Sequence, residues 1–401
     1  MAVQKTIMFV GAGQHQLPGL HYAKAQGYRV IALDGDPAAP GFSIADESQV
    51  VNIKDVDACF AVARKCDFNG VLALATEAGV RSASFIAEKL GLPGLPFSAA
   101  CNATDKRAMR EIFRDAGIPS TSFCSCGSID QALDGYRALG PRAVMKPANS
   151  AGSRGVSYVQ ALEEVSSAFA VAKAVAAGSE VLIEAFLEGP EVAVDGFMVG
   201  DDFYLFCVSD KVRTRPPALL DTSVIFPAER SASECDRIVD VATRAARALG
   251  IRNAPIHAEL IVTSDGPKMV EIAARGAGFH VFTQIMPWVS GVDTVRAQVA
   301  LCLGDRPDVQ ASSRRAAVLD FPLAPAGRVQ AIEGLELLAK DPELIFSEVF
   351  CKVGDVVGPL RSGADRIAAV CARGETLIDA RSVLSNALSN LTISIAQDLV
   401  Q

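Results

Sequence analysis

The first hundred residues alternate apolar segments of strand length with segments that carry a helical pattern. The strand-like segments are 6–10 (TIMFV), 29–34 (RVIALD) and 70–75 (GVLALA). The segments with a helical pattern are 18–27, 55–66 and about 77–90. Strands that are separated by helices usually pair side by side in one direction, with helices covering the faces of the sheet. The alternation therefore predicts a parallel, doubly wound α/β sheet.

The pattern changes beyond this region. A helix is predicted over 104–117, and hairpins are predicted over 191–209 and 257–273. Helices mixed with hairpins indicate an α+β region that extends to about residue 305. Residues 306–316 are predicted as a linker to a small C-terminal α+β domain.

The composition argues against several classes of protein. Of the 401 residues, 50% are hydrophobic and 21% are charged, which is typical of a globular chain with a large core. The formal net charge of −8 argues against a nucleic-acid surface. No apolar run reaches the length of a membrane span, and the ten cysteines are scattered without a CxxC pair. We therefore expect a cytoplasmic protein that binds neither nucleic acid nor membrane.

The segment GAGQHQ (11–16) begins like a dinucleotide-binding fingerprint, and Asp34 lies at a suitable distance downstream. The position of the third glycine is taken by Gln16, which disfavours NAD. Two interpretations remain for this segment. It is a tight turn between a strand and a helix, or it borders a crevice for a small anionic substrate.

The segment VMKPANSAGSRGV (144–156) joins two strand-like ends through a loop of small residues. Such a loop can turn its backbone N–H groups toward an anion. Lys146 comes before the loop, whereas the lysine of the GxxxxGK[ST] phosphate loop follows it. From this segment alone, a flap over a polyphosphate and an ordinary hairpin with an exposed lysine both remain open.

The hairpin at 257–273 carries two acids. A turn centred on residue 265 places Glu259 opposite Glu271, and His257 opposite Ala273. Facing carboxylates repel unless a cation lies between them, and Mg²⁺ prefers such oxygen ligands. The hairpin is thus either a Mg²⁺ site or an exposed strand face with two solvated acids.

The segment IEAFLEGPE (183–191) connects two predicted strands. Glu184 ends the first strand and Glu191 begins the second, with apolar residues between them. An apolar base with an acid and backbone groups at its edge suits a nucleotide. Taken alone, the segment fits an ordinary strand–turn–strand equally well.

In this order, the segments resemble the ATP-grasp superfamily from residue 6 to beyond 300. TDKRAMREIFRDAGIPS (104–120) resembles the lysine helix of that family, and 144–156, 183–191 and HAELIV…VEIAARGAG resemble its flap, hinge and metal hairpin. The most similar group is that of the carboxylate–amine ligases, with amino-acid ligases, biotin carboxylase and carbamoyl-phosphate synthetase. The resemblance implies a Rossmann-like pre-ATP-grasp domain, a two-lobed ATP-grasp domain and a C-terminal domain. We expect these parts at 1–103, 104–305 (with the flap lobe at about 120–190) and 312–401.

The resemblance also implies roles for single residues. Lys106 and Lys146 would contact the phosphates of ATP, and Arg275 with Lys146 would be catalytic, stabilising negative charge during transfer. The flap over 149–155 would close through backbone amides, with binding residues Ser150, Gly152, Ser153 and Gly155. The adenosine would be bound by Glu184, Ala185, Leu187 and Glu191. Glu259 and Glu271 would hold Mg²⁺, with Mn²⁺ as an alternative ion.

One position departs from the family pattern. Many members carry an asparagine two residues after the second glutamate as a further metal ligand, and this sequence has Ala273 there. The number of bound metal ions, one or two, therefore stays open.

The implied reaction is an ATP-dependent, ADP-forming ligation. A carboxylate, expected to be that of an amino acid or another small acid, would form an acyl phosphate, and an amine would then displace phosphate. The candidate substrate residues are Glu77, Lys211, Arg213, Arg275, Gly276 and Gly278. The alternatives are an ATP-grasp carboxylase or formyl-phosphate-type purine enzyme, an NAD-dependent oxidoreductase and a non-catalytic ATP-binding protein. Dimers are common in the family, so we also consider a homodimer.

Overall fold

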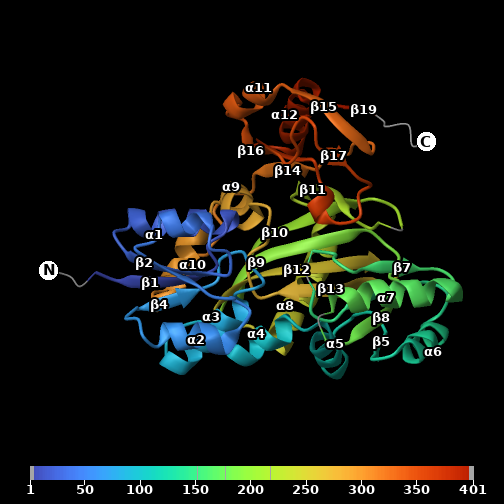
Figure 1. Ribbon diagram of the computed structural model, residues 1–401, viewed down its shortest axis with the longest axis horizontal. Helices are drawn as coiled ribbons and strands as arrows, with labels where there is room; N and C mark the ends of the chain where they lie inside the picture. The colour runs from blue at the N-terminus through green and yellow to red at the C-terminus, as the bar shows by residue number, and fades with distance from the viewer. Residues whose placement is uncertain (1–3, 151, 177, 217, 397–401) are drawn as a thin grey trace.

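The computed structural model describes residues 4–150, 152–176, 178–216 and 218–396. Three bodies surround a central sheet (Figure 1). The N-terminal domain lies on one side of this sheet, the flap lobe lies on the opposite side, and the C-terminal part lies above them in the view shown. None of the helices in the described ranges has both the length and the hydropathy that a bilayer crossing requires.

The N-terminal domain has the expected parallel sheet. Its strand order is β3-β2-β1-β4, and the pairs are parallel. The strands are β1 (Thr6–Val10), β2 (Arg29–Asp34), β3 (Glu47–Val50) and β4 (Gly70–Leu72). The helices are α1 (Leu17–Ala25), α2 (Val56–Ala63), α3 (Val80–Leu90) and α4 (Phe97–Ala103), of which α4 was not anticipated from the sequence. Every residue of β1 is buried, as expected for a central strand covered on both faces.

One predicted strand is shorter in the structure. The expected strand over 70–75 ends at Leu72. The carbonyl groups of Ala73 and Leu74 accept hydrogen bonds from the side chains of Gln298 (3.0 Å) and Gln16 (2.9 Å). The chain therefore leaves the sheet early, because side-chain amides rather than a neighbouring strand satisfy its backbone.

The central sheet is antiparallel and contains the predicted hairpins. Its order is β13-β12-β9-β10-β11-β14-β18-β16. The strands are β9 (Glu191–Val199), β10 (Asp202–Arg213), β11 (Asp221–Phe226), β12 (Ala254–Thr263), β13 (Gly266–Ala273), β14 (Ala316–Asp320), β16 (Leu344–Val349) and β18 (Ala368–Gly374). Since β11 pairs with β14, the sheet continues from the central part of the chain into the C-terminal part. The division into parts at 1–103, 104–305 and 312–401 stays a prediction. The central sheet, however, crosses the expected boundary between the second and third parts.

The flap lobe is a smaller sheet with the order β5-β8-β6-β7. Its strands are β5 (Phe123–Cys126), β6 (Ala143–Pro147), β7 (Ser157–Val159) and β8 (Val181–Ala185), with helices α6 (Ile129–Leu139) and α7 (Val165–Val175). The segment 144–156 is thus a strand, a loop and the approach to a second strand, as predicted. Helix α5 (Lys106–Asp115) precedes the lobe and is capped by Asp105, whose side chain accepts from the N–H groups of Arg107 and Ala108.

Further helices complete the molecule. Helix α8 (Ala232–Ala248), which was not anticipated, packs against β13 and begins with a capping box of Ser231 and Glu234. The segment after β13 contains a π-helical turn (Val281–Ile285), α9 (Met286–Ser290) and α10 (Thr294–Cys302). The C-terminal part adds β15 (Gly327–Glu333), α11 (Leu335–Lys340), β17 (Val356–Val357), α12 (Leu377–Asn390) and β19 (Thr392–Ala396).

The main hydrophobic core joins the N-terminal sheet to the central sheet. Phe9 of β1, Phe206 of β10 and Leu319 of β14 belong to one continuous cluster of buried side chains. These parts therefore share one core. The flap lobe has a separate core around Met145, Val165 and Ile183.

We predict that Gly70→Ala destabilises the protein. A Cβ atom at this position would lie 2.4 Å from the backbone carbonyl oxygen of Cys302, at the end of α10. The sheet and α10 must then separate, which we expect to cost about 1–3 kcal/mol. Thermal unfolding should therefore begin at a lower temperature. Gly358→Ala is the control, because a Cβ atom there meets no atom within 4 Å; equal unfolding temperatures for the two variants would contradict the prediction.

Candidate active site

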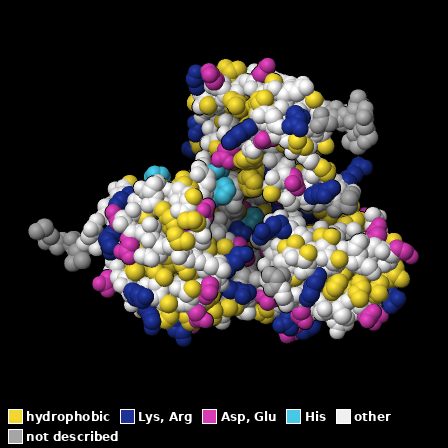
Figure 2. Space-filling model, in the orientation of Figure 1, with side chains coloured by type: hydrophobic (Ala, Val, Ile, Leu, Met, Phe, Trp, Pro, Cys, Tyr) yellow, Lys and Arg dark blue, Asp and Glu magenta, His cyan; other side chains and the backbone are white. Residues whose placement is uncertain are grey.

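A cavity of about 660 Å³ lies where the flap lobe, the central sheet and the C-terminal part meet. The space-filling view shows a hollow at this junction, with lysine, arginine and histidine side chains gathered around it (Figure 2). The predicted site residues that line the cavity are Lys106, Lys146, Ser150, Gly152, Ser153, Glu184, Ala185, Leu187, Glu191, Lys211, Arg213, Glu259, Glu271, Arg275 and Gly278. Tertiary structure thus brings most of the predicted residues together.

Lys106 connects the flap to the metal hairpin. It is the first residue of α5, and its side chain is almost completely buried. Its Nζ donates to the carbonyl oxygen of Ser150 at 2.6 Å and pairs with Oε1 of Glu271 at 2.8 Å. A cation therefore lies between the loop and the hairpin, at the edge of the cavity.

Lys146 and Glu184 form a buried group with Arg110. Glu184 Oε1 accepts from Arg110 Nε (2.8 Å), and Oε2 accepts from Arg110 Nη2 (3.3 Å) and pairs with Lys146 Nζ (2.8 Å). Burial opposes ionisation of Glu184, but the two cations hold its pKa below the usual value. Both carboxylate oxygens expected to face adenine are thus bound to protein cations.

Arg110 was not predicted as a site residue from the sequence. It follows Lys106 by four residues on α5, so the two side chains share one helix face. This spacing was the signal that could have revealed it.

The backbone of the hinge residue Ala185 also forms hydrogen bonds within the protein. The N–H of Ala185 donates to the carbonyl of Ser122 (2.9 Å), and its carbonyl accepts from the hydroxyl of Thr121 (2.6 Å). The next two residues, Phe186 and Leu187, form an apolar wall of the cavity. The wall suits a flat aromatic ring.

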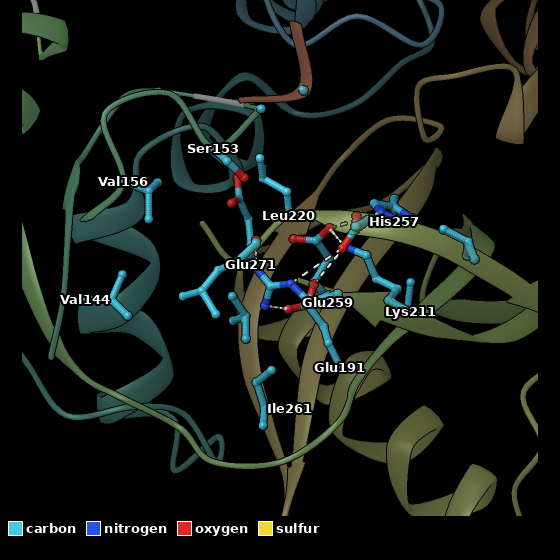
Figure 3. A pocket seen from close by; sticks show the side chains of 18 of the residues that line it. Val144, Ser153, Val156, Glu191, Lys211, Leu220, His257, Glu259, Ile261 and Glu271 are labelled. Atoms are coloured by element: carbon cyan, nitrogen blue, oxygen red, sulfur yellow. Dashed lines mark hydrogen bonds and ion pairs between the residues drawn. The ribbon is translucent and has the colours of Figure 1, made fainter. Parts of the chain in front are cut away.

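Lys211 lies beside Glu191 and Glu259 (Figure 3), and Asp221 is the third carboxylate near it. Its Nζ is 2.7 Å from Glu191, 2.6 Å from Glu259 and 3.0 Å from Asp221. Burial alone would lower the pKa of Lys211, but the three carboxylates raise it well above its usual value. Arg213 also binds Glu191 and lies 3.5 Å from Asp221. Lys211 and Arg213, two of the three basic residues proposed for substrate binding, are therefore engaged by acids. Nothing in the sequence indicated Asp221.

The metal hairpin has the predicted register. Glu259 pairs with Glu271 and His257 pairs with Ala273 across β12 and β13. The Nδ1 of His257 lies 2.9 Å from Asp195. Burial alone would lower the pKa of His257, but the carboxylates of Asp195 and Glu259 raise it to about 9.

The two glutamates fit a divalent cation by their chemistry. They occupy paired positions of the hairpin and both line the cavity, and carboxylate oxygens are ligands that Mg²⁺ prefers. Each glutamate has its Oε1 bound to a lysine, Glu259 to Lys211 and Glu271 to Lys106. Among the described residues, no group of three acids, histidines or cysteines is arranged around one metal position. The pair thus offers two carboxylates as metal ligands, and in this structure each carboxylate is neutralised by a lysine of the protein.

Arg275 joins the hairpin to the N-terminal domain. Its Nε lies 2.8 Å from Oε2 of Glu77, and its Nη1 donates to the carbonyl of Gly276. Glu77 and Gly276 are outside the set of described residues that line the cavity. A Cβ atom on Gly276 would lie 2.1 Å from the ring of Phe282, so close packing accounts for this glycine.

The flap loop reaches the cavity through three of its predicted residues: Ser150, Gly152 and Ser153. Gly155 packs away from it, where a Cβ atom would lie 3.0 Å from the ring of Pro147. Its φ of +75° also favours glycine. Ala151, within the predicted flap, lies outside the described residues.

Two family models match the chain. The ATP-grasp domain matches residues 140–283, and the L-amino acid ligase C-terminal domain 2 matches residues 320–396. The first match spans the flap, the hinge and the metal hairpin. The second match spans the C-terminal strands and helices above the cavity.

Curated relatives agree with these matches. The chain is 26% identical over 379 residues to the uncharacterized protein y4rH of Sinorhizobium fredii, covering 91% of this chain and 78% of that protein. It is 28% identical over 246 residues to the alanine--anticapsin ligase of Bacillus subtilis. That alignment covers 55% of this chain and about half (52%) of the ligase.

Solved structures share the fold. The L-amino acid ligase from Bacillus licheniformis has a TM-score of 0.84 at 21% identity, covering 99% of this chain and all of that one. The N5-carboxyaminoimidazole ribonucleotide synthetase from Thermotoga maritima has a TM-score of 0.72 at 19% identity, covering 98% of this chain and all of that one. With the paired glutamates, the two lysines and the flap in one cavity, these matches confirm the resemblance: the chain contains an ATP-grasp domain and an L-amino acid ligase C-terminal domain, and its relatives are ATP-grasp carboxylate–amine ligases.

Proposed function

We propose that this chain is an ADP-forming ligase that joins a small carboxylic acid, in particular an amino acid, to an amine through an acyl phosphate. The observation that carries the proposal is the pairing of Glu259 and Glu271, each bound to a lysine, in a cavity covered by the flap. Such a site offers cations for phosphates and carboxylates for a metal ion. The match of residues 320–396 to an L-amino acid ligase domain supports an amino acid as a substrate.

The phosphates of ATP would replace protein carboxylates as the partners of the cavity lysines. Its phosphates would accept from Lys106 and Lys146, and the release of Lys106 from Glu271 would free that carboxylate. Glu259 and Glu271 would then hold Mg²⁺, which supplies charge neutralisation for the phosphates when bound. The apolar wall formed by Phe186 and Leu187 would receive the adenine ring.

The chemistry needs no nucleophile from the protein. A carboxylate oxygen of the acid bonds to the γ-phosphorus of ATP, and the bond from that phosphorus to ADP breaks. The amine nitrogen then bonds to the acyl carbon, the C–O bond to phosphate breaks, and the amine proton leaves to solvent. The residues align the reactants and neutralise charge. Arg275 would neutralise charge in this way, and its 2.8 Å contact with Glu77 would hold its guanidinium in place.

A second candidate is the carboxylase or formyl-phosphate-type enzyme on the same scaffold. The chain is 28% identical over 187 residues to the formate-dependent phosphoribosylglycinamide formyltransferase of Chlorobaculum tepidum, covering 46% of this chain. That relative supports the ATP site but does not distinguish the acceptor. The C-terminal match favours the amino-acid ligase.

The test of the proposal is a substrate screen. Incubation with Mg-ATP and pairs of amino acids should release ADP and phosphate in equal amounts only when a suitable acid and amine are both present. Release that depends on formate or bicarbonate would favour the second candidate. Absence of ADP release above the background with every mixture would contradict the proposal.

We predict that Glu271→Gln retains the fold and loses turnover. The side chains are nearly isosteric, but the variant removes one negative charge from the metal site. We expect turnover to fall about 100-fold or more, as for the loss of a charge-stabilising group. Asp265→Asn on the same hairpin is the control, since its carboxylate is exposed and, among the described residues, binds Lys268 alone. Wild-type turnover by Glu271→Gln would show that the hairpin does not serve the reaction.

We also predict that nucleotide and metal stabilise the protein together. Mg²⁺ alone should have little effect, because lysines occupy the hairpin carboxylates in the absence of nucleotide. Mg-ATP should raise the unfolding temperature, and at 100 times its Kd the stabilisation is about 2.7 kcal/mol. Thermal unfolding with ATP, Mg²⁺, both, and NADH separates these cases. An equal rise with ATP in EDTA, or with NADH, would contradict the prediction.

A further inference from the structure

Arg366 is a half-buried cation on the C-terminal side of the cavity. It lies between the short helix Gly363–Asp365 and β18, and it lines the cavity together with Gly363. Its Nη2 donates to the backbone carbonyl of Asp221 at 2.9 Å. Its guanidinium lies 3.5 Å from the ring centre of Phe321 and 5.0 Å from that of Phe279. The side chain is therefore held in a defined position at the cavity wall.

Arg366 differs from the other buried or half-buried basic residues of this cavity in having no acidic partner. Each of the following is paired with a carboxylate: Lys106, Arg110, Lys146, Lys211, Arg213 and Arg275. Within the described residues, Arg366 forms no ion pair, and its buried Nε has no hydrogen-bond partner. Arg215, which also lines the cavity, is exposed to water.

A cation in this position is costly unless an anion accompanies it. Removal from water disfavours the charged form, so burial lowers the pKa of Arg366, and the nearby carboxylate of Asp221 offsets this lowering only in part. Stacking on Phe279 and Phe321 compensates for only part of this cost. An anionic ligand in the cavity would supply the missing partner, and a guanidinium can bind a carboxylate through two parallel hydrogen bonds.

We propose that Arg366 binds the carboxylate of the amine-donating substrate, which is therefore itself an amino acid. This inference rests on the proposed ligase function. Two carboxylates are then present in the reaction, and only one of them is activated. A carboxylate bound to a guanidinium has its lone pairs engaged and its charge neutralised, which makes it a poor nucleophile toward phosphorus. The carboxylate at Arg366 is thus the one that is not phosphorylated.

The position of Arg366 agrees with this assignment. Its backbone contact, Asp221, also binds Lys211, which binds Glu259 of the metal hairpin. The amino acid would enter with its carboxylate at the C-terminal part of the molecule and its amine toward the hairpin. The match of this part to an L-amino acid ligase domain includes both Arg366 and Phe321.

Hydroxylamine provides a test that separates the two steps of the reaction. It is a small amine without a carboxylate, and its nitrogen attacks the acyl carbon, releases phosphate and leaves a hydroxamate. Each amino acid is first incubated with Mg-ATP and hydroxylamine to find an acid that wild type activates. With that acid, initial rates are then measured against hydroxylamine and against a series of amino acids and their α-amides.

The variants are Arg366→Ala, Arg366→Lys and the control Arg373→Ala. Arg373 lies on β18 and stacks on Trp288 with 4.7 Å to the ring centre, outside the residues that line the cavity. Thermal unfolding establishes which variants are folded. If Arg366→Ala does not fold, Arg366→Lys, which retains a cation at this position, takes its place in the comparison.

For Arg366→Ala we expect KM for the amine-donating amino acid to rise about 10-fold or more, as for a lost hydrogen bond to a charged group. Hydroxamate formation and KM for ATP should stay near wild type, and the preference of wild type for the amino acid over its amide should disappear. Arg366→Lys should recover part of this preference, and Arg373→Ala should keep all of it.

Two results would overturn the inference alone. One is a parallel fall in hydroxamate and amide formation, which would assign Arg366 to the acid, the nucleotide or the fold. The other is an unchanged preference for the amino acid over its amide in a folded Arg366 variant. Absence of hydroxamate with wild type and every acid would instead overturn the ligase function, and this inference with it.

Discussion

The arrangement of the cavity depends on buried ion pairs between lysines and carboxylates. Lys211 on β10 contacts carboxylates from β9, β11 and β12, so a single ammonium group connects four strands of the central sheet. Loss of one partner from such a group would leave an uncompensated charge away from water, which is strongly destabilising. The acids and lysines therefore constrain one another, and the cavity keeps its polar walls without a ligand.

These pairs also suit exchange with a charged ligand. Lys106 binds both the flap carbonyl of Ser150 and the carboxylate of Glu271. A polyphosphate with a divalent cation can satisfy both members of the second pair, the phosphates binding the lysine and the cation binding the glutamate. Binding would then replace ion pairs rather than create unpaired charges, which keeps the desolvation cost low.

The parts of the molecule differ in how firmly they are joined. The N-terminal sheet, the central sheet and the C-terminal strands share one core, and β11 pairs with β14 across the expected domain boundary. The hairpin of β12 and β13 and the strand β18 that follows Arg366 belong to one sheet. The flap lobe has its own core. A lobe with its own core could move separately from the central sheet, as the proposed closure over the phosphates of ATP would require.

The spacing of apolar, polar and glycine residues along short segments determined much of the secondary structure of this protein. The parallel strands of the N-terminal domain, the strand–loop–strand of the flap and the register of Glu259 with Glu271 all follow from spacing along short segments, because side-chain direction repeats with a fixed period. Helix α8 was not predicted, although its capping box of Ser231 and Glu234 is a local signal. The early end of β4 did not follow from the sequence, because the side chains of Gln16 and Gln298, which are distant along the chain, bind the carbonyls after β4. Only the tertiary structure decided which charges meet. Arg110 with Glu184, Lys211 with Asp221, and Arg366 without an acid depend on strands and helices that are distant in sequence, and ion pairing is a property of atoms in space rather than of neighbours along the chain.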